Sequence, residues 1–201
     1  MSSLTWAARQ TVGTQTGGKR STSLGRPFAS PATTQLYLPM LATCWATLAR
    51  TSKAAIGLMD RSLELNPSFA HGWRWSGWIR LYAGQADLAI EHFQTSLRLS
   101  PRDRTAGRLT GIGIAYFFGR RFDDAAATLL TSLEELPAHA TPYRFLASCY
   151  AHMGRLDEAR EIVRRLRVVT PVVVPSATPY RKAEQRELFL SGLRMAAGDA
   201  T

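Results

Sequence analysis

The six residues Ser-Leu-Glu-Leu-Asn-Pro at positions 62–67 return along the chain with small changes. They reappear as Ser-Leu-Arg-Leu-Ser-Pro at 96–101 and as Ser-Leu-Glu-Glu-Leu-Pro at 132–137, and more loosely before Pro171. The prolines that close these phrases are spaced 34, 36 and 34 residues apart. A period near 34 residues is typical of helix–turn–helix units, so we expect an all-α chain of stacked helical hairpins.

Between the prolines, each unit has the same internal order: an apolar run, a glycine, and an acid that opens a second run. These glycines and acids are Gly84 and Asp87, Gly119 and Asp123, and Gly154 and Asp157. Glycine permits the turn that ends a first helix. An acid in the first turn of the second helix meets free backbone N–H groups and the positive end of the helix dipole. The proline then stops the second helix, because it cannot continue one.

These positions resemble the tetratricopeptide repeat (TPR), whose pattern is W-x2-L-G-x2-Y…A-x3-F…P. The matching residues are Trp73, Ser76, Gly77, Ala89, Phe93 and Pro101 in the first complete repeat; Leu109, Ile112, Gly113, Tyr116, Ala125, Leu129 and Pro137 in the second; and Tyr143, Leu146, Ala147, Tyr150, Ala159, Val163 and Pro171 in the third. The resemblance implies a right-handed α-α superhelix of TPR hairpins. The small residues Gly77, Gly113 and Ala147 would let paired helices approach each other closely.

Composition separates a tail from this repeat region. Residues 1–34 are rich in Ser, Thr, Gly, Pro and Arg, with apolar residues scattered singly, and we expect them to be disordered. The TPR domain is predicted at 35–201, divided into a partial repeat (36–69), three repeats (70–103, 106–139 and 140–173) and a capping helix (184–197). The predicted first helix of the partial repeat, Leu36 to Ala49, contains Pro39 and is followed by Arg50 where glycine would be expected. Residues 172–175 are predicted to be an extended connector packed on the last repeat.

The formal net charge of +10 is unevenly distributed. Six Lys or Arg and no acid precede Asp60, whereas 19 basic and 15 acidic residues follow from there. Such a tail can hold nucleic acid or anionic lipid without sequence preference, which we keep as one hypothesis. The mixed charges of the repeats indicate a solvated surface instead, so a dedicated nucleic-acid-binding function is not favoured.

Cysteine content and hydropathy favour a protein of the cytoplasm. Cys44 and Cys149 both lie in apolar helical contexts, which does not suggest a disulfide framework. The most apolar stretch has 14 residues, fewer than the roughly 20 that a membrane span needs. An N-terminal transit peptide is the alternative, because residues 1–30 are basic, Ser/Thr-rich and free of acid.

Candidate catalytic and metal motifs are weak. Cys149 and His152 have a metal-chelating spacing, but no second ligand pair accompanies them. The Gly111-Ile-Gly113 segment begins like a dinucleotide fingerprint but has Tyr116 at the place of the third glycine. Paired carboxylates occur only at predicted helix starts and ends, where capping explains them. We therefore expect a protein that is not an enzyme, with no cofactor, metal or small-molecule substrate.

In TPR proteins, the first helices of successive repeats line a concave groove that holds a peptide or a helix of a partner protein. The positions that the resemblance assigns to this groove are His71, Arg74, Trp78, Leu81, Tyr82, Thr110, Ile114, Phe117, Phe118, Thr141, Arg144, Ser148 and His152. Trp78 is interpreted either as an aromatic anchor for a partner or as a contact to an adjoining helix or capping segment. Arg74 and Arg144 would pair with carboxylates of a ligand. The Lys/Asn/Arg clamp with which chaperone-binding TPR proteins hold a C-terminal carboxylate is not matched.

A narrower resemblance covers about residues 52–198. The segments 66–78, 143–154 and 186–194 are similar to the TPR region that follows the catalytic domain of some bacterial class III adenylate/guanylate cyclases. In those proteins, the metal-binding aspartates lie upstream, whereas the upstream stretch here contains no acid. Cyclase activity is therefore not expected of this chain. The alternative function is that of a detached or truncated regulatory region of such a cyclase.

Overall fold

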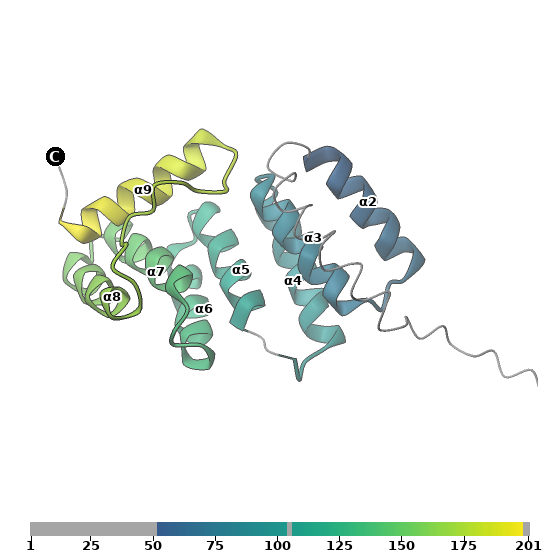
Figure 1. Ribbon diagram of the computed structural model, residues 1–201, viewed down its shortest axis with the longest axis horizontal. Coiled ribbons are helices and arrows are strands. Elements are labelled where there is room, and N and C mark those ends of the chain that lie inside the picture. Colours follow the sequence, from purple (N-terminus) through teal and green to yellow (C-terminus); the bar gives the residue numbers. More distant parts are fainter. Residues whose placement is uncertain (1–51, 104–105, 199–201) are drawn as a thin grey trace, which may run out of the picture. The chain divides into compact units, whose positions relative to one another are not determined.

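Helices are the regular structure in the computed structural model, which describes residues 52–103 and 106–198. These residues belong to one unit, Leu41–Thr201 (Figure 1). Its described helices are α2 (Ser52–Leu65), α3 (Ala70–Tyr82), α4 (Ala86–Leu99), α5 (Ala106–Phe118), α6 (Phe122–Glu135), α7 (Ala140–His152), α8 (Leu156–Val169) and α9 (Ala183–Ala197). The predicted all-α fold is confirmed. The predicted tail, 1–34, and the predicted helix 36–49 lie outside the described residues.

The helices form antiparallel pairs that stack in chain order. α3 packs against α4, α5 against α6, and α7 against α8, and neighbouring pairs meet through α4 and α5 and through α6 and α7. α2 packs against α3, while α9 packs against α7 and α8. The architecture is that of the predicted stack of helical hairpins, because no single hairpin buries its apolar face by itself.

The second helix of each hairpin has one buried face at helical spacing. Buried residues recur three or four positions apart, among them Ala89, Phe93 and Ser96 in α4, Ala125, Leu129 and Ser132 in α6, and Ala159, Val163 and Leu166 in α8. The residues that end α2, α4, α6 and α8 each lie two positions before a proline. The predicted proline stops are therefore confirmed.

Glycines allow the two helices of a hairpin to approach closely. A Cβ atom added at Gly77 would lie 2.8 Å from the Phe93 ring of α4. One added at Gly113 would lie 2.7 Å from Cγ of Leu129 in α6. Both distances are shorter than carbon–carbon contact permits, so the predicted role of these glycines at helix crossings is confirmed. Ala147 is completely buried in α7.

The turn inside each hairpin needs one residue in the left-handed region. Gly84 and Gly154 supply it with φ of 79° and 76°. In the middle hairpin this residue is Arg120, with φ of 59°, and not the predicted Gly119. Arg120 lies three residues before Asp123, the same separation that Gly84 and Gly154 have from their acids. The prediction assigned the turn to the adjacent glycine, whereas the backbone turns one residue later and tolerates a side chain there at a cost in free energy.

In the hairpins α3–α4 and α5–α6, the serine of the repeated Ser-Leu phrase forms a hydrogen bond between the two helices. Ser96 Oγ donates to the carbonyl oxygen of Ala70 at 2.8 Å, and Ser132 Oγ donates to that of Ala106 at 2.8 Å. Both serines are buried, and each bond joins the end of a second helix to the beginning of the first. The repeated Ser-Leu phrase thus closes the hairpin.

Arg108 joins two hairpins from within the core. Its side chain begins on α5 and is only 1% exposed. Nη1 donates to the carbonyl oxygens of Ser96 and Ser100 at 3.2 Å each, and Nη2 donates to that of Asp103 at 2.9 Å. These carbonyls lie in the last turn of α4 and just after it, where a helix has acceptors without partners of its own. The guanidinium group therefore caps α4 from the next hairpin.

Candidate binding groove

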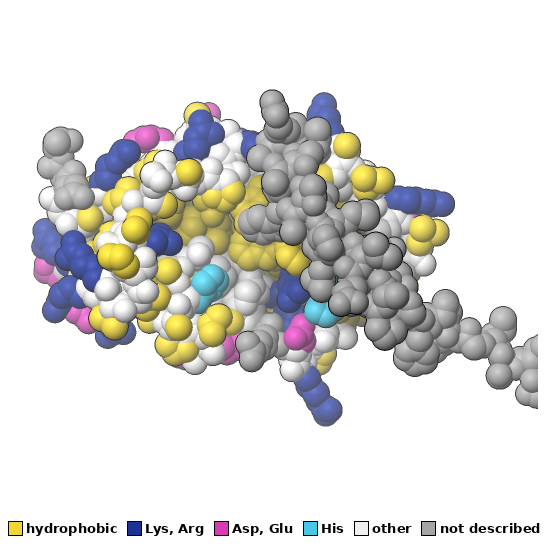
Figure 2. Space-filling model, in the orientation of Figure 1, with side chains coloured by type: hydrophobic (Ala, Val, Ile, Leu, Met, Phe, Trp, Pro, Cys, Tyr) yellow, Lys and Arg dark blue, Asp and Glu magenta, His cyan; other side chains and the backbone are white. Residues whose placement is uncertain are grey.

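The predicted groove positions recur on the first helices α3, α5 and α7. Those whose side chains remain at least partly exposed are His71, Arg74, Trp78 and Tyr82 on α3, Phe118 on α5, and Thr141, Arg144 and His152 on α7. Figure 2 shows hydrophobic side chains gathered in the middle of one face, over α5 and between α9 and α3. We call the partly exposed set the groove face.

Five predicted groove residues are buried and do not belong to this face: Leu81, Thr110, Ile114, Phe117 and Ser148. Phe117 packs edge-on against Phe145 of α7, with ring centroids 5.3 Å apart. Thr110 turns toward α6, where its Oγ1 lies 2.8 Å from Oγ of Ser132. Leu81 and Ile114 are completely buried in the core. The resemblance placed these residues on the groove side, but other helices cover them, α6 of the same hairpin in the case of Thr110 and α7 of the next hairpin in the case of Phe117.

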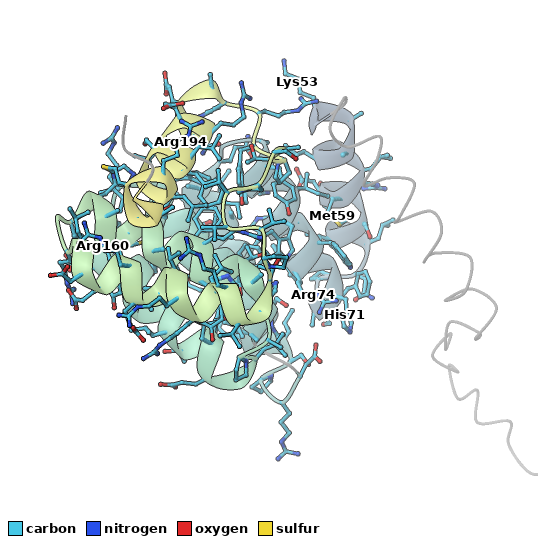
Figure 3. The ribbon with its side chains drawn as sticks, turned by 60° about the vertical axis from the view of Figure 1, so that its left-hand side comes forward. Lys53, Met59, His71, Arg74, Arg160 and Arg194 are labelled. Atoms are coloured by element: carbon cyan, nitrogen blue, oxygen red, sulfur yellow. The ribbon has the colours of Figure 1, made fainter. Side chains whose placement is uncertain are left out.

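The α3 part of the groove face carries positive and aromatic groups together. His71 is exposed, and Figure 3 shows it beside Arg74 and far from Arg160 of α8. The Arg74 guanidinium lies over the ring of Trp75, 5.5 Å from its centroid. A cation next to an aromatic ring suits a ligand that offers a carboxylate beside an apolar group.

Trp78 makes the contact to an adjoining helix that was one of its two interpretations. Its ring packs edge-on against Phe93 of α4, with centroids 5.3 Å apart, and stacks on Tyr82 at 5.8 Å. It is nevertheless only partly buried, so one side remains part of the groove face. Phe93 and Tyr82 therefore support the Trp78 ring on its buried side.

The chain's own residues 170–182, here called the connector, lie across the groove face from α7, where Arg144 holds Val173, to α3, where Tyr180 contacts Tyr82. This segment follows α8, has no regular secondary structure and leads into α9. Its Tyr180 is 5% exposed, and its ring contacts Tyr82 of α3, Phe118 of α5, Phe145 of α7 and Phe189 of α9, with centroid distances of 5.9, 4.7, 5.9 and 6.2 Å. One side chain thus bridges the three first helices.

The α7 part of the groove face is engaged by the connector and α9. Arg144 donates from Nε to the carbonyl oxygen of Val173 at 3.0 Å and from Nη2 to that of Val172 at 2.7 Å. Ser148 Oγ donates to the carbonyl oxygen of Phe189 at 3.1 Å, and Nε2 of His152 lies 2.7 Å from that of Leu188. The predicted role of Arg144 in binding carboxylates is therefore replaced, in this structure, by a role in holding backbone carbonyls.

Sequence reasoning missed Tyr180, Lys182 and Gly192. Lys182 Nζ donates to the carbonyl oxygen of Gly84 at 3.1 Å, across 98 positions of sequence. A Cβ atom at Gly192 would lie 2.7 Å from Nε2 of His152, so glycine permits α9 to approach α7. The sequence contained one local indication of this contact: Tyr180 is an aromatic residue at the end of a proline-rich segment, and such a residue is expected to pack on a neighbouring surface.

Cys149 of α7, next to the groove face, carries a buried thiol. Burial raises the pKa of the Cys149 thiol to about 12, so it is a poor nucleophile and metal ligand. His152, its predicted spacing partner, is engaged with α9. Within residues 52–103 and 106–198, no group of three or more His, Cys, Asp or Glu side chains is arranged to hold a metal ion. In the same ranges, no helix is long and apolar enough to cross a lipid bilayer.

Stacked antiparallel hairpins with small residues at their crossings define a class of all-α repeat proteins that act as protein-interaction modules. Two sequence profiles described as tetratricopeptide repeat match this chain, one over residues 49–104 and the other over residues 120–171. Together the two profiles span just over half of the chain. The chain is a tetratricopeptide-repeat protein. Among curated protein sequences, none matches it.

Solved structures support the same fold. A crystal structure of MamA is 20% identical with a TM-score of 0.56, covering 73% of this chain and 87% of its own. TTC0263, a thermophilic TPR protein from Thermus thermophilus, is 20% identical with a TM-score of 0.57, covering 82% and 80%. YrrB, described as a TPR protein with an unusual peptide-binding site, is 20% identical with a TM-score of 0.51, covering 73% and 77%. None of these is a cyclase, so the narrower resemblance gains no support.

Proposed function

We propose that the chain binds a peptide or helix of a partner protein along the groove face, and that it acts by binding and not by catalysis. The observation that carries this proposal is the α3 surface, where the Arg74 guanidinium lies over the Trp75 ring and partly buried Trp78 follows four positions later on the same helix. Aromatic and arginine side chains dominate the energetics of protein interfaces. The ligand that suits them has an acidic group next to an apolar side chain.

The rigidity of this surface supports a binding role. Trp78 rests on Phe93 and Tyr82, so its ring loses little conformational freedom when a ligand covers it. His71 and Arg74 lie three residues apart on α3 and therefore face the same side of that helix. YrrB, which has the same fold, is described as having a peptide-binding site. A ligand would enter at α3 and extend toward Phe118.

A crosslinking experiment tests this location. A photoreactive benzoylphenylalanine replaces His71 in the full chain, and a matched variant carries it at Arg160 on α8, which lies far from His71 and Arg74 in Figure 3. Irradiation in lysate should give a crosslinked partner from position 71 and not from position 160. Adding Arg74→Glu should remove the product, because it reverses the charge beside the ligand. A product that forms equally at both positions, or that survives Arg74→Glu, would place binding elsewhere.

A further inference from the structure

We infer that the connector is the groove's own occupant, and that the partner is an extended segment that places an aromatic side chain where Tyr180 lies. This inference rests on the proposed function and specifies its ligand. The connector and the partner would then compete for the same aromatic pocket, formed by Tyr82, Phe118, Phe145 and Phe189.

The first support is the way in which the connector is held. Tyr180 is its only buried residue, and the pocket around it draws one aromatic ring from each of α3, α5, α7 and α9. Arg144 holds the backbone oxygens of Val172 and Val173. An aromatic side chain in a pocket, together with bonds to main-chain carbonyls, is a way of recognising an extended peptide that depends little on the rest of its sequence.

The second support is the composition of the connector. Pro171, Pro175 and Pro179 fix their own φ angles and restrict the residues before them. A segment of this kind is extended before it binds, so it loses little entropy when a groove receives it. A peptide of the same character from another protein would meet the same small cost.

The third support is that the connector is incompletely satisfied in place. Oγ1 of Thr178 and, in the first turn of α9, Oε1 of Gln185 are buried without a hydrogen-bond partner. Val172 is 52% exposed, and Pro171, Ser176, Ala177 and Pro179 are exposed as well. Release of the connector into water would give Oγ1 of Thr178 hydrogen-bond partners, while exposing Tyr180 and the partly buried Val173 and Val174. A competing segment that leaves no polar group unsatisfied would bind the groove face with a more favourable free energy than the connector does.

The test uses the connector itself as the probe. A fluorescein-labelled peptide with the sequence of residues 170–182 is titrated with the full chain, and binding is followed by fluorescence anisotropy. The Tyr180→Ala chain should bind this peptide at least about tenfold more tightly than the unchanged chain, because its pocket is empty. The same peptide carrying Tyr180→Ala should lose that gain. The control is a Val172→Ala chain, in which a connector side chain outside the pocket is shortened. It should bind the peptide with the same affinity as the unchanged chain.

Two further variants keep the result decisive. If Tyr180→Ala loses its helical circular-dichroism signal, Tyr180→Leu retains an apolar side chain in the pocket and should show a smaller gain in peptide binding. Phe118→Ala, added to either variant, should abolish the gain. Equal binding by all chains, or equal binding of the Tyr and Ala peptides, would show that the connector is a fixed cap. Crosslinking at position 71 would then still report groove binding, so the two proposals can fail separately.

Discussion

Arg120 occupies a turn position at which the neighbouring hairpins have glycine. Its φ of 59° brings its Cβ close to its own backbone, at a cost of about 1 kcal/mol. Arg120→Gly removes that cost and should raise the free energy of unfolding by about 1 kcal/mol, less the entropy that glycine adds to the unfolded chain. Urea denaturation measures the gain. Gly154→Ala is the matched control and should destabilise by a similar amount, and a loss of stability in Arg120→Gly would contradict the assigned turn.

His92 links α4 to α3 through its ring nitrogen, Nδ1, which lies 2.9 Å from Oγ of Ser76. Burial and the positive charge of Arg80 lower the pKa of His92 to about 4, while Asp60 acts in the opposite direction. The unfolded chain, with a His pKa near 6.5, therefore takes up a proton before the folded chain does. The stability contributed by neutral His92 is full above about pH 6.5 and is lost as the pH falls toward 4.

A pair of denaturation series tests this dependence on pH. The unchanged chain should lose more unfolding free energy between pH 7.5 and 4.5 than His92→Gln, whose side chain does not titrate. Contributions from the carboxylates and from His139 are common to both chains and cancel in the difference. Parallel curves for the two chains would mean that His92 is protonated in the folded state at the lower pH.

At the scale of helices, the crossing of α5 and α6 depends on Gly113. Gly113→Leu places a side chain against Leu129 and should lower the free energy of unfolding by about 1–3 kcal/mol. Gly107→Ala, on the same helix, is the control, because no atom lies within 4 Å of its added Cβ. That change should be neutral or should stabilise by up to about 1 kcal/mol. An unchanged melting temperature for Gly113→Leu would refute the crossing.

The helices and their ends could be predicted because their determinants are local. A proline two residues after each second helix, and an acid in the first turns of α4, α6 and α8, act within one turn of the chain. The position of the left-handed residue was missed at Arg120, because Gly119 beside it carries the stronger local signal. The burial of Thr110 and Phe117 was missed for a different reason: it is decided by other helices, α6 of the same hairpin for Thr110 and α7 of the next hairpin for Phe117.

At the scale of the whole molecule, the groove face was predicted on α3 and altered on α7. The family resemblance assigned His71, Arg74 and Trp78 to the groove side of α3, and each of them is at least partly exposed. The contacts that cover α7 come from residues 28 to 41 positions later in the chain, as between Arg144 and Val172 or between Ser148 and Phe189. No period links such residues, because the connector and α9 lie outside the repeat. The repeat pattern therefore predicts which side of the first helices faces outward, but it does not predict that the connector and α9 pack there.

Cooperativity between hairpins gives the last prediction. In a stack of repeats, stability is the sum of each unit and its contacts with its neighbours. Arg108 caps α4 from α5, so Arg108→Ala leaves the buried carbonyl oxygens of Ser96 and Ser100 without that donor. We expect a loss of about 3 kcal/mol and a broader urea transition, because the α2–α4 part would unfold before the rest. Arg98→Ala is the control, because Arg98 is exposed and its hydrogen bond to Thr95 lies within α4. It should change neither the free energy of unfolding nor the width of the urea transition. The contrary outcome is that Arg108→Ala lowers the midpoint of the urea transition without changing its slope. In that case α2–α4 and the later helices still unfold together through their apolar contacts, and Arg108 contributes stability but not the coupling.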